Sequence, residues 1–168
     1  ILFYGQSPHK WKTITDNSCP NRKFMHDYHL YSDSTYYFIT FGQGLGKRIQ
    51  NIPSSTSPVN NTVIDFDDRK YHEKELYNFI KSGRNWYGEM FDNVTSMNFN
   101  FNFPNIVTGV PVIIKSNVTA RCITCSSSFT FKANGQSIGS VTVQQVPALY
   151  YGDYVNQADY CTSFNASS

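Results

Sequence analysis

Hydrophobic and polar residues alternate along several stretches of this chain with the period of a β-strand. In residues 97–103, a methionine and three phenylalanines occupy the odd positions and three asparagines occupy the even ones. Successive side chains of a strand point to opposite faces, so this run predicts a strand with one apolar and one polar face. Pro104 ends the run, because proline cannot donate to a ladder of hydrogen bonds.

Other runs rich in β-branched and aromatic residues predict further strands. They cover residues 1–5, 35–41, 62–66, 110–115, 117–122, 128–132 and 137–143. Asn134-Gly135 separates the last two and predicts a tight hairpin turn, since type I′ turns favour Asn followed by Gly. Short strands at roughly ten-residue spacing are typical of an antiparallel sandwich or barrel rather than of a parallel sheet.

One segment predicts an α-helix, over about residues 70–82. Leu76, Phe79 and Ile80 have the i, i+3, i+4 spacing of an apolar stripe. Two aspartates just before the segment suit a helix N-terminus, and Gly83 suits a left-handed C-terminal stop.

The expected fold is therefore mainly β, an antiparallel β-sandwich with one α-helix and long loops. The two longest loops, at 7–27 and 52–61, are polar and lack periodicity. A chain of 168 residues and 19.2 kDa has the size of one domain. We expect residues 1–168 to form a single β-sandwich-like unit.

Composition narrows the classes of protein to which the chain can belong. Aromatic residues make up 16% and charged residues 15% of it, which excludes a disordered tail and a coiled coil. The net charge of +2 gives no electrostatic reason to expect a nucleic-acid partner. No apolar run approaches the ~20 residues of a membrane span.

The opening of the chain and its polar residues point to export. The first residue is Ile1, and no signal peptide precedes it. The polar residues are mostly Asn, Ser and Thr, a composition common among exported proteins. We therefore expect a piece of a longer exported chain whose targeting signal lies upstream.

Four cysteines, Cys19, Cys122, Cys125 and Cys161, can form two disulfides in an oxidising compartment, and all three pairings are open. Cys122 and Cys125 have CxxC spacing, but a second CxxC or a pair of spaced histidines is missing, so no metal site is expected. The pair also falls in a predicted strand, where residues three apart point to opposite faces. A mutual bridge would need a bend there, and buried or free thiols are the alternative.

Two further motifs are weak candidates for chemistry. Residues 42–48 are rich in glycine, but Phe41 stands where a phosphate loop needs its first glycine, and Arg48 where it needs Ser or Thr. Residues 26–29, His-Asp-Tyr-His, offer acid–base or metal-binding groups, yet no cysteine has the surroundings of a nucleophile. A flexible turn and backbone-bonded loop histidines are the simpler interpretations, so no catalytic residue and no cofactor is expected.

The densest cluster of special side chains follows the predicted helix. It comprises Arg84, Trp86, Tyr87 and Glu89. These residues could form a sugar- or peptide-binding face, because aromatic rings stack on sugars and Arg pairs with carboxylate or phosphate. The alternative is a packed corner in which Trp86 and Tyr87 are buried and Arg84 pairs with Glu89.

Several longer stretches, taken in order, carry a family resemblance. They are ILFYGQ at 1–6 followed by Trp11, YSDSTYYFIT at 31–40, GKRI at 46–49, LYNFIKSGRNWYGE at 76–89, FNFPN at 101–105 and NGQ at 134–136. Together they resemble the gingipain-like cell-surface sortases of the Bacteroidota type IX secretion system, the PorU family. The resemblance spans about residues 1–150, and several motifs in one order are more specific than any one of them.

The resemblance implies a non-catalytic, β-rich segment that lies N-terminal to a Cys–His peptidase domain. The whole protein would be a cysteine endopeptidase that removes the C-terminal secretion signal of cargo proteins and joins them to an anionic lipopolysaccharide. Its place would be the outer membrane or cell surface. Its partners would be the downstream peptidase domain and, beyond it, secreted cargo or other components of the secretion system.

This sequence departs from the family in two respects. No position matches the family's catalytic motifs, so no catalytic role is carried over, and the Cys122–Cys125 pair has no counterpart in the family pattern. Two other functions therefore stay open. One is a secreted carbohydrate- or protein-binding β-sandwich module of an adhesin or glycan-active enzyme. The other is an enzyme complete in this chain.

Overall fold

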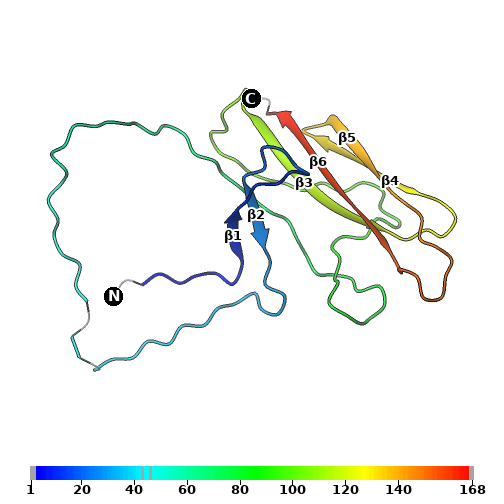
Figure 1. The fold of residues 1–168 in the computed structure, drawn as a ribbon, viewed down its shortest axis with the longest axis horizontal. Coiled ribbons are helices and arrows are strands. Elements are labelled where there is room, and N and C mark those ends of the chain that lie inside the picture. The colour runs from blue at the N-terminus through cyan, green and yellow to red at the C-terminus, as the bar shows by residue number, and fades with distance from the viewer. Residues whose placement is uncertain (1–2, 43, 46, 167–168) are drawn as a thin grey trace.

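The structure, a computed structural model, describes residues 3–42, 44–45 and 47–166. Within these residues every regular element is a β-strand, and no helix is present. Six strands pair in three antiparallel two-stranded sheets, β1–β2, β3–β6 and β4–β5 (Figure 1). The chain is therefore mainly β with small antiparallel sheets, as the alternating pattern predicts.

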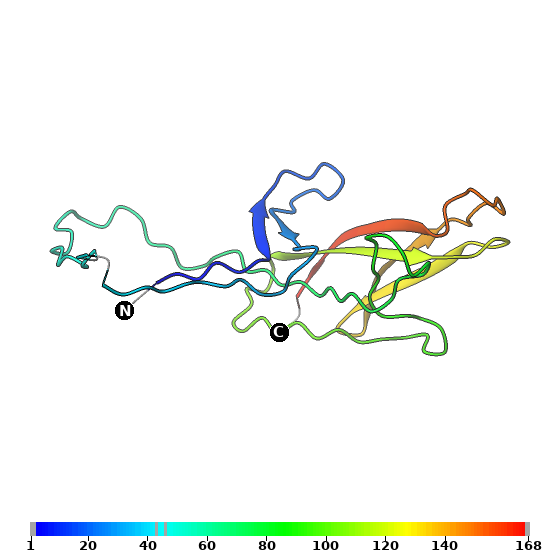
Figure 2. The same cartoon turned by 90° about the horizontal axis from the view of Figure 1, so that it is seen from below.

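The first sheet is a hairpin of β1 (Lys10–Thr13) and β2 (Phe24–Asp27). It lies within the stretch that the sequence predicted as a long polar loop. The hairpin projects beside the other two sheets (Figure 2). Two four-residue strands are too short for their alternation to stand out in the sequence.

The longest ladder pairs β3 (Pro111–Ala120) with β6 (Asn156–Asn165) over ten residues. The sequence predicted two consecutive strands where β3 runs without a break. It did not predict β6, whose residues are mostly polar and lack a clear apolar face.

The third sheet is the hairpin of β4 (Ser127–Ala133) and β5 (Gln136–Val143). Its turn is Asn134-Gly135, with φ values of +48° and +84°. These left-handed conformations are those of a type I′ turn, which Asn and Gly adopt at the lowest cost. The predicted hairpin is confirmed.

The two larger sheets contact each other through β5 and β6. The Tyr160 ring of β6 stacks on Phe131 of β4 with 4.5 Å between centroids, and its hydroxyl donates to the carbonyl oxygen of Ile138. Gly139, at φ +129°, leaves the space for that hydroxyl. Among the described residues, the fully buried side chains are Cys19, Val143 and Val146.

Two disulfides tie the elements together, and they settle which of the three possible pairings this structure has. Cys19–Cys161 joins the β1–β2 loop to β6, with Cα atoms 5.5 Å apart. Cys122–Cys125 closes the connection between β3 and β4. The prediction that this second pair lies in a strand is wrong: β3 ends at Ala120, and the bend that a mutual bridge needs follows it.

The predicted helix at about 70–82 is absent: the chain runs extended through residues 70–76 and turns at 79–80. Extension lets alternate side chains contact two surfaces: Tyr71 faces the β1–β2 hairpin, whereas His72 packs on Phe99, 4.7 Å between centroids. A one-residue bridge pairs Tyr77 with Tyr87. These contacts between distant segments outweigh a short apolar stripe, which gives only a weak helix preference.

The end of the predicted helix is a turn fixed by a side chain. The Asn78 amide donates to the carbonyl oxygen of Ser82 and accepts from its N–H, both at 3.0 Å, and Lys81 has φ +53°. Asn side chains compete with helical hydrogen bonds in this way.

Three predicted strands are not paired in the described part of the chain. These are residues 35–41, 62–66 and 97–103, and of the predicted strand 1–5, residues 1–2 lie outside the described residues. Alternation reports the fit of a segment to a sheet, but a strand also needs a neighbour with free backbone groups. The described residues of the long connection between β2 and residue 67 instead extend away from the sheets (Figure 1).

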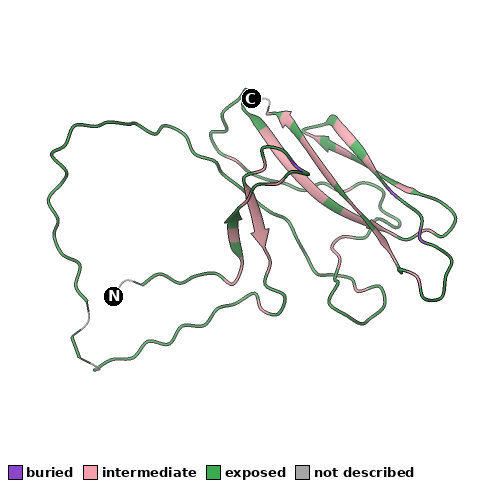
Figure 3. Cartoon of the chain, in the orientation of Figure 1, coloured by how far each residue is buried: buried purple, intermediate pink, exposed green. Residues whose placement is uncertain are grey.

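The chain exposes an unusual amount of surface for its size. Its accessible area is 14589 Å², against about 8,400 Å² for a compact monomer of this mass. Much of the excess lies along the extended segments, which are exposed almost throughout (Figure 3). Phe38 and Ile64, in two of the unpaired predicted strands, are 94% and 91% exposed.

Candidate functional site

The four residues predicted as a binding face follow the turn at 78–83 and lie in different surroundings. Trp86 is half-exposed, with 50% of its surface accessible. It lines a shallow hollow of about 410 Å³, together with Leu76, Tyr77, Asn78, Lys81, Ser82 and Gly83. An exposed indole beside a hollow with one cation is a surface on which a sugar ring can stack.

Tyr87 is part of the scaffold behind this hollow. Its ring packs on Phe79 with 5.0 Å between centroids, and its hydroxyl accepts from the side chain of Gln157 at 3.4 Å. Phe79 also approaches Tyr154, whose ring carries the guanidinium of Arg121 at 4.3 Å. Tyr87 therefore joins the segment to β6, which is the packed-corner interpretation for this residue.

Glu89 pairs with residues that the sequence did not indicate. Its Oε1 lies 2.9 Å from Nε2 of His72 and 3.4 Å from Nζ of Lys74. Burial opposes ionisation of Glu89, but the hydrogen bonds from His72 and Lys74 outweigh it and hold its pKa below the ordinary value. The expected pair with Arg84 is not formed, and Arg84 makes no hydrogen bond or ion pair with other described residues.

A second cluster lies on one face of the β1–β2 hairpin, and we call it the imidazole cluster. It consists of His9, Trp11, His26, Tyr28 and Tyr71. Trp11 and His26 are directly paired across the two strands. His9 and Tyr28, each next to the end of its strand, contact each other and His26 on the same face.

His26 lies at the centre of the imidazole cluster. Its ring stacks on Tyr71 with 3.5 Å between centroids and 16° between planes. Both its ring nitrogens are buried, and they have no hydrogen-bond partner among the described residues. Burial lowers the pKa of His26, the charge of His9 lowers it further, and Asp27 opposes both effects.

The segment at 67–71 packs against this face of the hairpin. The Arg69 guanidinium lies 4.3 Å from the ring centroid of Phe24 and 5.4 Å from that of Trp11. Asp67 forms an ion pair with Lys23 at 2.6 Å. The face is therefore filled by the chain's own cation and rings rather than left as a cavity.

Of the two histidines in the His-Asp-Tyr-His motif, His26 belongs to the imidazole cluster and His29 acts locally. Nδ1 of His29 accepts hydrogen bonds from the backbone N–H groups of Tyr31 and Ser32, at 3.2 and 3.0 Å. This is the predicted loop histidine bonded to the backbone. Among the described residues no group of three or more His, Cys, Asp or Glu side chains is placed to hold a metal ion. All four cysteines are in disulfides.

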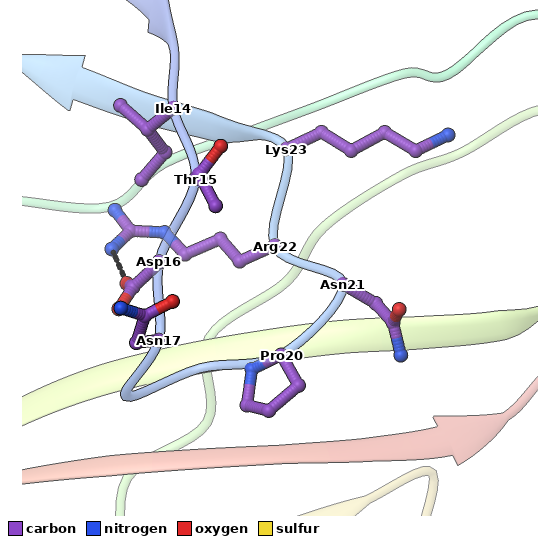
Figure 4. Close-up of a pocket in the computed structure, with 8 residues that line it drawn as sticks. All are labelled: Ile14, Thr15, Asp16, Asn17, Pro20, Asn21, Arg22 and Lys23. Carbon is purple, nitrogen blue, oxygen red and sulfur yellow. Dashed lines mark hydrogen bonds and ion pairs between the residues drawn. The ribbon is translucent and has the colours of Figure 1, made fainter.

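A charged network supports the Cys19–Cys161 bridge. The Asp16 carboxylate lies 2.9 Å from Nη1 of Arg22, a contact visible in Figure 4, and 3.6 Å from Nζ of Lys115 on β3. Lys115 in turn pairs with Asp159 on β6. Hydrogen bonds from Ser18 and then Arg22 hold the pKa of Asp16 well below its usual range.

The glycine-rich stretch at 42–48 contributes no site among its described residues. Gly42 and Gly44 have φ values of +84° and +102°, which are typical of glycine in turns. Leu45 is fully exposed. Gln43 and Gly46 lie outside the described residues.

In comparisons with protein-family models, with curated proteins and with solved structures, nothing matched the chain. The part of the chain that the structure describes contains no helix with the length and apolar character of a bilayer span. The functional interpretation therefore depends on the residues themselves.

Proposed function

We propose that this chain is a non-catalytic accessory segment of a gingipain-like, type IX secretion sortase. Its role is to bind the peptidase domain of the same protein, which the resemblance places downstream, and so to orient that domain or its cargo. The chemistry resides in the peptidase domain. The segment acts at the outer membrane or cell surface, and two disulfides suit such an oxidising environment.

One observation carries the proposal. Residues 31–41, which include one of the longest stretches of family resemblance, are extended and largely exposed. Tyr36, Phe38 and Phe41 have exposed fractions of 80%, 94% and 78%. Apolar surface of this extent is typical of an interface, and an extended backbone can add a strand to a partner's sheet.

A β-sandwich is the arrangement that we propose for the assembled segment. The β3–β6 and β4–β5 sheets already contact each other through Tyr160. Strands formed by 35–41 and 62–66 on binding would extend them and cover the exposed aromatic side chains. Burying about 25 cal/mol per Å² of apolar surface stabilises such an assembly.

The test compares this chain alone with the longer product of its gene by hydrogen–deuterium exchange. We expect amides of 35–41 and 62–66 to exchange freely in the isolated chain and slowly in the longer protein. Phe38→Ser should restore fast exchange there, whereas Tyr150→Ser, at an equally exposed tyrosine outside these stretches, should not. A gene product without a Cys–His peptidase domain would contradict the sortase assignment.

The second candidate is a carbohydrate-binding module, and the half-exposed Trp86 beside its hollow favours it. The indole ring of Trp86 would stack on the apolar face of a sugar ring, and such binding needs no catalytic group. Trp86→Ala should then abolish retention of the chain on a glycan array while leaving its unfolding midpoint unchanged. Tyr151→Ala, also exposed, is the matched control, and equal retention of all three proteins contradicts this candidate.

A further inference from the structure

We propose that the Cys122–Cys125 bridge is a site of thiol–disulfide exchange with low-molecular-weight thiols. The Cys19–Cys161 bridge is, by contrast, a structural link that such thiols do not reach. The two bridges occupy different surroundings in one chain, and each therefore serves as the reference for the other.

The Cys122–Cys125 bridge lies where a small thiol can reach it. Cys122 and Cys125 lie in the bend between β3 and β4, outside both ladders, and Cys125 is exposed. Exchange requires that a thiolate reach one sulfur of the bridge, so exposed disulfides are the labile ones. Cys19 has no accessible surface, and its partner Cys161 is less exposed than Cys125.

The two bridges also close loops of very different length. The Cys122–Cys125 bridge spans three residues in sequence and the Cys19–Cys161 bridge spans 142. In the chain-entropy account a disulfide stabilises the folded state more when it closes a longer loop. Opening the short loop therefore costs the fold less.

The exchange step conserves atoms and electrons. A thiolate attacks Sγ of the exposed Cys125, a new sulfur–sulfur bond forms there, and the electron pair of the broken bond passes to Sγ of Cys122. That leaving sulfur lies 4.0 Å from the hydroxyl of Thr124, which can donate a hydrogen bond to the thiolate. Return attack by Cys122 on the mixed disulfide expels the thiol and restores the bridge.

The fold tolerates the open state. The carbonyl oxygen of Cys122 accepts from the N–H of the buried Val146 at 2.8 Å, so this end of the bend stays anchored after the bridge opens. The strands on either side keep their own partners, β6 and β5. Only the residues between the two cysteines gain freedom.

The test titrates the oxidised chain with reduced glutathione, blocks free thiols with an alkylating reagent, and maps the modified cysteines by mass spectrometry. We expect glutathione or the alkylating group on Cys122 and Cys125 at a glutathione concentration about tenfold lower than that needed for Cys19 and Cys161. Circular dichroism should stay unchanged over that range. Opening of Cys19–Cys161 first or at the same concentration overturns the proposal, as does a Cys122–Cys125 bridge that opens only on unfolding.

Matched single variants give an independent readout with oxidised glutathione. Cys122→Ser leaves the Cys125 thiol, which should form a mixed disulfide in the folded protein. Cys19→Ser leaves Cys161, which should react only after denaturant is added. An unreactive Cys125 thiol in folded Cys122→Ser also overturns the proposal, whether or not the Cys19→Ser variant folds.

Discussion

Single residues in this protein are fixed by contacts with segments far away in the sequence. Tyr160 places its hydroxyl against the backbone of β5, where Gly139 stands with φ +129°. A Cβ atom at position 139 would overlap the Tyr160 hydroxyl. The residue would also have to adopt a backbone conformation that L-residues rarely adopt. The close approach of β5 and β6 thus depends on one missing Cβ atom.

Gly139→Ala should lower the free energy of unfolding by about 1–3 kcal/mol, because strain at φ and the overlap with Tyr160 add together. Urea denaturation followed by circular dichroism measures the loss. Gly109→Ala is the matched control, since Gly109 has φ +92° but no atom near its would-be Cβ. Equal losses in the two variants would show that the contact with Tyr160 contributes nothing.

Protonation of His26 should destabilise the hairpin. Its pKa is lowered in the folded chain from an ordinary value of 6.5, because burial and the charge of His9 outweigh the opposing charge of Asp27. The folded state therefore takes up this proton at a lower pH than the unfolded state does. The contribution of neutral His26 to stability is fully present above pH 6.5 and is lost as the pH drops through the lowered pKa. The urea midpoint of the wild type should decrease between pH 7.5 and pH 5.

In His26→Phe this part of the pH dependence should disappear, because phenylalanine keeps the stack on Tyr71 without a titrating group. A wild-type midpoint as flat as that of the variant would contradict the assignment of His26. Hydrogen bonds from Ser18 and Arg22 hold the pKa of Asp16 well below its usual range, so Asp16 does not contribute to the comparison.

At the scale of elements, the extended segment at 67–71 determines whether the long excursion at 29–68 stays attached. Tyr71 stacks on His26, and Arg69 lies over Phe24 and Trp11. Tyr71→Ala should release the segment from the hairpin and accelerate cleavage by trypsin at Arg69 and Lys70. The matched variant Tyr150→Ala, at a ring without these contacts, should be cleaved at the wild-type rate, and equal rates for both variants would contradict this role.

Local chemistry was enough to predict some elements and not others. The β4–β5 hairpin followed from alternation and from Asn134-Gly135, because both signals lie within the hairpin itself. β6 escaped prediction because its ten residues are ordered by pairing with β3 and by Tyr160, not by an apolar pattern of their own. The helix at 70–82 was a wrong prediction, since contacts of Tyr71 and His72 with two distant surfaces favour extension.

The residues of the candidate site likewise differ in how far the sequence predicted their surroundings. The sequence left Trp86 open between a binding face and a buried corner, and the structure leaves it half-exposed beside a hollow. The partners of Glu89 were not predictable, because His72 and Lys74 reach it only when their segment is extended. The imidazole cluster was missed for the same reason: its members come from residues 9–11, residues 26–28 and residue 71.

At the scale of the whole molecule, the long bridge outweighs the short one in stability. Removing Cys19–Cys161 by a double change to alanine should lower the free energy of unfolding by about 5 kcal/mol, against about 2 kcal/mol for Cys122–Cys125. The difference follows from the lengths of the closed loops. Urea midpoints of the two double variants measure it, and equal losses would contradict the entropic account.

The same long bridge also determines how the chain would carry mechanical force. A pull applied before Cys19 and after Cys161 passes through the sulfur–sulfur bond and not through the 142 residues of sequence that it spans. Strands β2 to β5, the long excursion and the short bridge lie inside this closed ring, whereas β1 and the last residues of β6 lie outside it. The segments inside the ring would therefore remain unloaded while the flanking chain is stretched, and tension could extend only the residues outside the ring.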